Sequence, residues 1–254
     1  MIATLYLLIV GGLECILDTI KRTWIGLFPY LKSTTKMLQL SNISLILVSG
    51  LGYRTEENIF ALKYSQKGIK FGETKYIQLD SIRGIEDWSR AIIYDLPKYI
   101  DTEFCLLVHE NGFVVNPESW NPEWLNYDFI GSPWPLPNDP ISYKDEEGNI
   151  VRVGNSVSIR SKKLLNLIAT REWKSYYGGY NEDGFITCHN RKWLESQGCK
   201  FAPLEVAKWF GRELEIPENQ DVDKPFIFHY NKVFPGRNIK YRHLLGGFIR
   251  DKVI

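Results

Sequence analysis

The sequence predicts an α/β protein in which helices flank a mixed, mostly parallel sheet. Two observations lead to this prediction. Short apolar runs that are typical of buried strands alternate with segments of helical periodicity. Each apolar run also ends in polar residues or glycine, as a parallel strand does where its carboxyl end enters a loop. Because ligands bind beyond the carboxyl ends of such strands, we expect these polar ends to meet at one cleft.

The predicted elements follow one another from residue 41 onward. The clearest strand contains the continuous apolar run from Phe104 to Val108, and Gly68 is placed to end the first helix. In chain order, the elements are a strand at 41–50, a helix at 55–68, a strand at 71–80, a helix at about 87–98 and a strand at 103–113. The polar ends that we expect to converge lie at 49–54, 80–84 and 109–112.

The amino-terminal segment differs from this α/β pattern. Residues 3–17 are apolar but contain Glu14, and they fall short of the roughly 20 apolar residues that span a bilayer. No basic segment precedes them, as a signal peptide would require. A helix over 13–31 would carry one apolar stripe, and three placements stay open. The helix could pack on the protein or on a partner, lie at a membrane interface, or span the membrane.

We therefore divide the chain into three parts. An apolar helical extension with its linker covers 1–37, the α/β domain covers 38–235, and a basic tail covers 236–254. The tail either lies on an anionic membrane surface or forms a solvated basic helix.

Composition and motifs argue against several function classes. The 254 residues carry 31 Lys and Arg against 30 Asp and Glu, so the chain lacks the basic surplus of a nucleic-acid binder. Its four cysteines show no C-x-x-C spacing, which argues against structural zinc and fits a reducing compartment. Neither G-x-G-x-x-G nor G-x-x-x-x-G-K-[ST] occurs, so dinucleotide-binding and P-loop functions lose their main support.

Six short blocks carry a more specific signal. They are VHENGF (108–113), NYDFIGSPWP (126–135), VGNSVSIRS (153–161), NEDGF (181–185), KFAPLEVA (200–207) and FIFHYNK (226–232). Their order resembles that of a glycosyltransferase-like family, often described only as a domain of unknown function, that accompanies bacterial and viral surface-glycan genes. The resemblance covers about 38–231. It implies a single Rossmann-like domain of the A type, which uses a nucleotide-sugar donor.

The resemblance also implies a divalent metal, Mg or Mn, that bridges the two phosphates of the donor. Glu110 and Asn111 stand at the family's Asp-x-Asp-like motif, and His229 matches a late histidine that ligates metal or donates to the diphosphate. Asn111 replaces the usual Asp, so a neutral carbonyl takes the place of a carboxylate. Metal dependence is therefore open, and the alternative is a polar strand end without a ligand.

Two adjacent acids, Glu182 and Asp183, match a Glu-Asp pair of the family. An inverting transferase needs a carboxylate that takes the proton of the acceptor hydroxyl as this hydroxyl attacks the anomeric carbon. We expect Asp183 to be this base, with Glu182 as the second candidate. The alternative is that both acids only complement the dipole of the helix that follows them.

The remaining matches to the family assign residues to the acceptor side and to the donor side of the cleft. The resemblance places Asp128 and Trp134 on the acceptor side, or else in a buried turn and the core. It places Asn155 and Arg160 on the donor side, although Arg160 could instead tie down a helix in an ion pair. Their block is one residue shorter than in the family and lacks its double glycine, which leaves the donor sugar open.

From topology alone we expect Ser49, and Arg54 or its neighbour Tyr53, near the base and ribose of the donor. The sequence thus predicts a hexosyltransferase-type enzyme that moves a sugar from a nucleotide-diphosphate donor to a glycan or lipid-linked acceptor in surface polysaccharide (lipopolysaccharide) synthesis. We expect it in the cytoplasm, peripherally at the inner face of a membrane, and without a nucleic-acid partner. The main alternative is a catalytically weakened nucleotide-sugar or carbohydrate-binding protein. A glycoside hydrolase with Glu110 and Asp183 as its two carboxylates is a further alternative.

Overall fold

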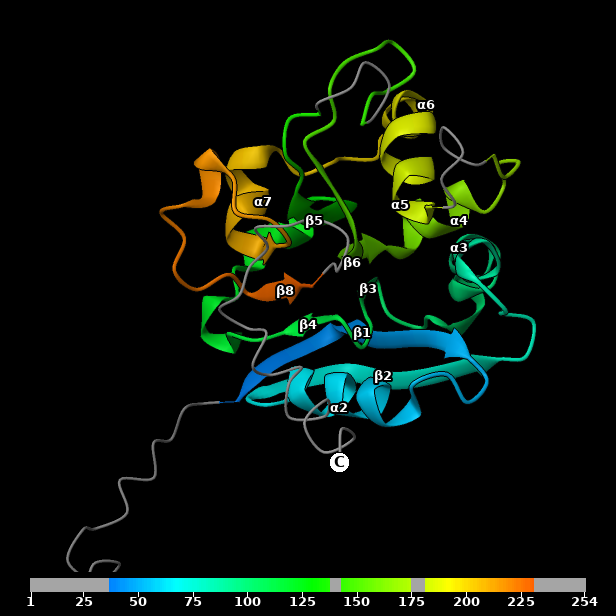
Figure 1. Ribbon diagram of the computed structural model, residues 1–254, viewed down its shortest axis with the longest axis vertical. Helices are drawn as coiled ribbons and strands as arrows, with labels where there is room; N and C mark the ends of the chain where they lie inside the picture. Colours follow the sequence, from blue (N-terminus) through cyan, green and yellow to red (C-terminus); the bar gives the residue numbers. More distant parts are fainter. Residues whose placement is uncertain (1–36, 138–142, 175–180, 231–254) are drawn as a thin grey trace, which may run out of the picture. The chain divides into compact units, whose positions relative to one another are not determined.

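A five-stranded sheet in the order β2-β1-β3-β6-β5 forms the centre of the fold (Figure 1). The computed structural model describes residues 37–137, 143–174 and 181–230. The expected helix at 13–31 and the basic tail at 236–254 lie outside these residues. The strands of the sheet are β1 (Leu38–Gly50), β2 (Ile69–Leu79), β3 (Phe104–Val108), β5 (Phe129–Pro133) and β6 (Val153–Ser161).

The α/β class is confirmed, but the sheet is less parallel than the sequence suggests. β1 pairs in parallel with β2 and β3, whereas β6 is antiparallel to both β3 and β5. Two of the four pairings are therefore parallel. The difference arises because β6 inserts between β3 and β5 in the opposite direction, which no strand–helix–strand pattern announces.

A second, three-stranded sheet carries His229, one of the residues that the sequence predicts for the site. Its order is β4-β8-β7, with β4 at Gly112–Val114, β7 at Gly211–Arg212 and β8 at Ile227–His229. The strand expected over 103–113 ends at Val108, and a tight turn leads into β4. Since β4 pairs with β8, Gly112 lies opposite His229.

Helices cover both faces of the central sheet, because its middle strands are apolar on both sides. Leu45 and Leu47 of β1 pack in one core cluster with residues of α2, while Ile46 and Val48 pack in another with α3 and α4. The α-helices are α2 (Thr55–Ser65), α3 (Ile85–Tyr94), α4 (Lys162–Ile168), α5 (Glu182–Gly184), α6 (Arg191–Ser196) and α7 (Leu204–Phe210). A π-helical turn at Phe185–His189 follows α5, and 3₁₀ turns lie at Leu96–Tyr99, Pro117–Ser119, Pro122–Asn126 and Pro217–Asn219.

Two findings concern the expectations about membrane association and about the cysteines. In the part of the chain that the structure describes, no helix is long and apolar enough to cross a membrane. Cys105, Cys188 and Cys199 are buried thiols that form no disulfide.

Glycine permits a close approach of β5 and β6 that supports one end of the site. A Cβ atom on Gly131 would lie 1.7 Å from the carbonyl oxygen of Gly154, and one on Gly154 would lie 2.0 Å from the Trp134 ring. The Trp134 ring therefore rests directly on the backbone of β6.

Gly131→Ala should destabilise the protein by about 3 kcal/mol, because β5 and β6 must separate to admit the methyl group. The melting temperature should fall by roughly 6–12 °C in thermal unfolding followed by circular dichroism. Gly84→Ala is the matched control, since a Cβ at Gly84 meets nothing within 4 Å. Equal melting temperatures for the two variants would contradict the close approach.

Candidate active site

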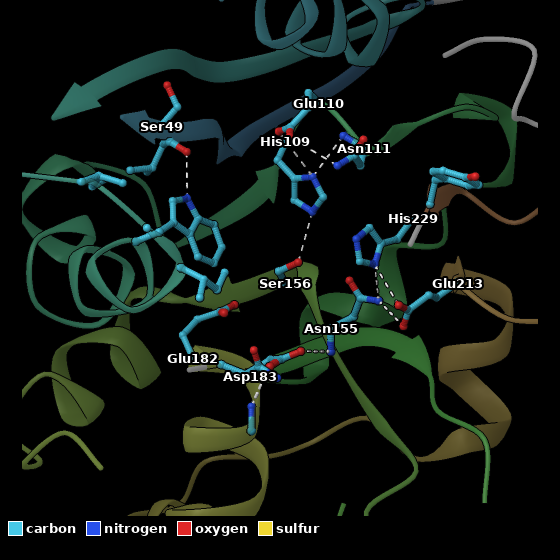
Figure 2. A pocket seen from close by; sticks show the side chains of 18 of the residues that line it. Ser49, His109, Glu110, Asn111, Asn155, Ser156, Glu182, Asp183, Glu213 and His229 are labelled. Carbon is cyan, nitrogen blue, oxygen red and sulfur yellow. Dashed lines mark hydrogen bonds and ion pairs between the residues drawn. The ribbon is translucent and has the colours of Figure 1, made fainter. Parts of the chain in front are cut away.

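The carboxyl ends of β1, β2 and β3 open into a cavity of about 1200 Å³. The three polar strand ends that the sequence singles out all contribute to its wall. The lining residues fall in 48–53, 82–85, 88, 109–111, 134–137, 143, 155–156, 181–184, 213–214 and 229–230. Figure 2 shows how acids, amides and imidazoles from both sheets and from α5 point toward one another in this cavity.

The turn between β3 and β4 carries the first group of site residues. The backbone N–H groups of His109 and Gly112 each donate to the other residue's carbonyl oxygen at 2.9 Å. His109 Nδ1 accepts the backbone N–H of Asn111 at 3.1 Å, so the ring proton of the neutral imidazole lies on Nε2. Burial, and secondly the nearby His229, hold the pKa of His109 well below its usual value.

This tautomer decides what the contact between His109 and Ser156 can do. His109 Nε2 lies 3.1 Å from Ser156 Oγ and therefore donates its proton to that oxygen. A histidine that activates a serine must instead accept the hydroxyl proton. The pair therefore lacks the geometry of a serine nucleophile and its base.

Glu110 lies between a cation and an amide. Its Oε1 accepts from Arg54 Nη1 at 3.3 Å and from Asn111 Nδ2 at 3.3 Å. The Arg54 guanidinium also lies over the ring of Tyr53, which lines the cavity. Burial raises the pKa of Glu110, while the Arg54 charge opposes that rise. Arg54 is thus not part of the cavity lining itself, but it contacts two lining residues, Glu110 and Tyr53.

The predicted ligands do not fit a metal site built by the protein alone. The residues that the structure describes contain no group of three His, Cys, Asp or Glu side chains that could hold a metal ion. Glu110 Oε1 is shared by Arg54 and Asn111, whereas His229 turns its Nδ1 toward Asn155 and Glu213 (Figure 2). Glu110 is the single carboxylate of the predicted set.

The two adjacent acids of α5 have different surroundings. Glu182 is buried and accepts from Arg160 Nη2 at 2.6 Å, and Arg160 is itself fully buried. Asp183 lines the cavity and accepts the backbone N–H groups of Gly184 at 2.8 Å and Asn155 at 3.1 Å. One acid therefore holds a buried cation, and the other is available to a ligand.

Asp183 has the pKa of a group that exchanges protons near neutral pH. Burial, and next the negative charge of Glu182, raise the pKa of Asp183 to about 7. The Gly184 N–H and the Arg160 charge oppose this rise. A carboxylate poised near the working pH is suited to general base catalysis. Asp183 also lies two residues before the π-helical turn, a feature that is frequent at functional sites.

A third group joins the two sheets at the cavity. Asn155 Nδ2 lies 2.9 Å from both Glu213 Oε2 and His229 Nδ1, and His229 Nδ1 lies 3.4 Å from Glu213 Oε1. The rings of His109 and His229 meet edge to face with their centroids 4.8 Å apart. Sequence reasoning missed Glu213, because it reaches the cavity through the pairing of β7 with β8 and belongs to none of the six blocks.

The other predicted site residues divide into two groups. Ser49 and Trp134 line the cavity, where Ser49 contacts the Tyr76 hydroxyl at 3.1 Å and Trp134 packs on Tyr143 with ring centroids 4.4 Å apart. Arg160 and Asp128 lie outside the cavity lining.

Asp128 ties three segments of backbone together. Its carboxylate accepts from the Ser161 hydroxyl at 2.6 Å and from the Lys200 N–H at 2.8 Å. Ser161 in turn caps α4 by accepting the Leu164 N–H. The carboxylate of Asp128 thus joins β5 to the end of β6 and to the segment before α7.

Glu182→Gln should destabilise the protein by about 3 kcal/mol, because the Arg160 charge is then left buried without a counter-charge. Urea denaturation measures the loss. Glu86→Gln is the matched control, since it removes the same charge from an exposed pair with Arg90 and should cost under about 0.5 kcal/mol. Similar losses in the two variants would contradict a structural role for the buried pair.

Asp183→Asn should change how stability depends on pH. A carboxyl whose pKa is raised from 3.8 to about 7 by folding stabilises the folded state at low pH, and this stability is lost as pH rises between the two values. The variant cannot ionise there, so its stability relative to the wild type should increase by roughly 2 kcal/mol from pH 5 to pH 7. Denaturation curves that run parallel over this range would contradict the raised pKa.

Residues 74–229 match the family described as "Protein of unknown function (DUF5672)", which covers more than half of the chain. No curated protein matches the chain.

Proposed function

The chain belongs to the DUF5672 family, and we propose that it transfers a sugar from a nucleotide-diphosphate donor to a hydroxyl group. The observation that carries this proposal is the position of Asp183. Its pKa is raised to about 7, and it lines a cavity at the carboxyl ends of three sheet strands. The resemblance of the six sequence blocks to A-type nucleotide-sugar transferases, and the α/β fold around the cavity, support the same function.

In the proposed reaction Asp183 acts as the general base. Its carboxylate takes the proton of the acceptor hydroxyl while the hydroxyl oxygen forms a bond to the anomeric carbon. The bond from that carbon to the diphosphate breaks, and its electron pair leaves with the nucleoside diphosphate. The N–H groups of Gly184 and Asn155 hold the carboxylate in place during this step. Glu182 is engaged by Arg160, so its proposed part is to position α5.

Charge on the leaving diphosphate needs stabilisation by groups fixed in advance. Arg54 is the cation that the structure places at the turn after β3, beside Glu110. A Mg or Mn ion carried by the phosphates would contact Glu110 as its carboxylate ligand, and such ions commonly keep most of their ligands from phosphate and water. Because the protein residues do not fit a complete metal site, no step above depends on a metal.

The acceptor side of the proposed site is the wall that contains Trp134. Trp134, Leu136 and Tyr143 present flat or apolar surfaces to the cavity. Such surfaces suit the apolar face of a sugar ring. We therefore propose a glycan or lipid-linked glycan as the acceptor, in surface polysaccharide synthesis at the cytoplasmic face of a membrane.

One observation favours a second candidate function. Asn111 stands where the resembling family has Asp, and its amide donates to Glu110 instead of supplying a carboxylate. A nucleotide-sugar or carbohydrate-binding protein with weakened catalysis would tolerate this exchange. It would bind the donor without turnover, which separates the two functions experimentally.

The test is donor binding and turnover in the wild type and in Asp183→Asn. Binding is screened by thermal shift with a panel of nucleotide sugars, with and without Mg or Mn, because a ligand of the native state raises its stability. Turnover is measured as release of nucleoside diphosphate in the presence of a glycan acceptor panel. Asp183→Asn should lower turnover at least 100-fold, roughly the value of a general base, and leave donor affinity within about threefold.

Asp95→Asn is the matched control, because Asp95 pairs with Lys98 on the surface. Its turnover should equal that of the wild type. Unimpaired turnover in Asp183→Asn would remove this residue from the base role. Donor binding without turnover in the wild type would favour the binding protein. No shift with any donor would contradict the transferase and leave carbohydrate binding as the candidate function.

A further inference from the structure

Asn155 adopts a backbone conformation that normally favours glycine. Its φ of 94° lies in the left-handed region, where a side chain is strained. Such a residue persists when the surrounding structure holds it in place. Asn155 is buried, at 1% exposure, and both ends of its amide are engaged.

The orientation of this amide follows from its partners. Asn155 Oδ1 accepts the backbone N–H of Val157 at 2.9 Å, which only an oxygen can do. Nδ2 donates to Glu213 Oε2 at 2.9 Å, which only an N–H group can do. Two independent contacts therefore place the NH₂ group toward Glu213 and His229.

This orientation fixes the proton on the ring of His229. Nδ1 of His229 lies 2.9 Å from the donor Asn155 Nδ2, so Nδ1 must accept. Glu213 Oε1 would favour a proton on Nδ1, but it lies farther away, at 3.4 Å. The shorter contact, from an amide that cannot turn, leaves the ring proton on Nε2.

The other nitrogen of the ring is open to a ligand. His229 lines the cavity, and among the described residues Nε2 has no hydrogen-bond partner. We propose that Asn155 is a positioning residue that locks His229 in the Nε2–H tautomer, so that the ring presents a hydrogen-bond donor to an anionic oxygen in the cavity. The identity of that oxygen, a phosphate oxygen of a nucleoside diphosphate, rests on the proposed function.

The same contact separates the two roles that the sequence leaves open for His229. A metal ligand needs a lone pair on the nitrogen that faces the ion, and in this tautomer Nε2 carries a proton. His229 is then the diphosphate donor and not the metal ligand. His109 has the same tautomer, fixed by the Asn111 N–H, but its Nε2–H group already donates to the Ser156 hydroxyl oxygen. The two imidazoles therefore divide into one structural donor and one free donor.

The test is the tautomer of His229 in the full-length protein, read by long-range proton–nitrogen NMR of ¹⁵N-histidine. The chain has four histidines, and His229→Gln identifies the signal by its loss. The wild type should show a protonated Nε2 and an unprotonated Nδ1. A protonated Nδ1 in the wild type would overturn the proposal.

Two variants separate the amide from the backbone strain. Asn155→Gly removes the amide and suits a φ of 94°, while Asn155→Ala removes the amide and keeps the strain. Both should move the proton of His229 toward Nδ1, where Glu213 accepts it. Only Asn155→Ala should melt at a clearly lower temperature than the wild type. An unchanged tautomer in Asn155→Gly would overturn the proposal, even if Asn155→Ala fails to fold.

Calorimetric titration with nucleoside diphosphates then tests the ligand. Asn155→Gly should bind about tenfold more weakly than the wild type, as expected for one lost oriented hydrogen bond. Unchanged affinity would overturn the role of the Nε2–H group as the donor to phosphate. If the wild type binds no nucleoside diphosphate but shows the expected tautomer, the proposed function fails while the positioning by Asn155 stands.

Discussion

The buried ion pair between Arg160 and Glu182 is the interaction on which the cavity depends. Both side chains are almost fully excluded from solvent, so neither charge is tolerable without the other. Arg160 belongs to β6 and Glu182 to α5, and the pair therefore fixes α5 against the central sheet. Asp183 follows Glu182 directly and faces the cavity instead of the core. The ion pair thus helps to place Asp183, whose pKa is raised first by burial and next by the charge of Glu182.

The sequence was most informative where strands are buried on both faces. The apolar runs of β1 and β3 predict the cores of those strands, because burial on both faces leaves a continuous signal. β2 lies at the sheet edge, where buried residues are interspersed with exposed ones. The break at Val108 could not be predicted in the same way. It depends on the pairing of β4 with β8, which lies more than 100 residues further along the chain. The antiparallel insertion of β6 also depends on segments that are distant in the sequence, since Phe104 of β3 lies opposite Ser161. It makes the sheet less parallel than expected.

The candidate site, too, could be predicted from the sequence only where the signal is local. Residues at strand ends or in the six blocks, such as Ser49, Asn111 and Asp183, line the cavity that the topology predicts. Asp128 and Arg160 belong to the same blocks but hold backbone segments and a buried acid, and sequence alone does not separate these roles. Glu213 reaches the cavity through the pairing of β7 with β8 and belongs to none of the six blocks, so its sequence context carries no local signal.

The flat contact between Trp134 and the backbone of Gly154 sets the width of one end of the cavity. No side chain of β6 stands behind the Trp134 ring there, because a Cβ on Gly154 would overlap the ring. A smaller residue at 134 would therefore open space down to the β6 backbone without interrupting its ladder. Exchange of this one wall residue would thus change the size of the ligand that this end of the cavity admits, while β6, which carries Asn155 and Arg160, and α5, which carries Glu182, stay as they are.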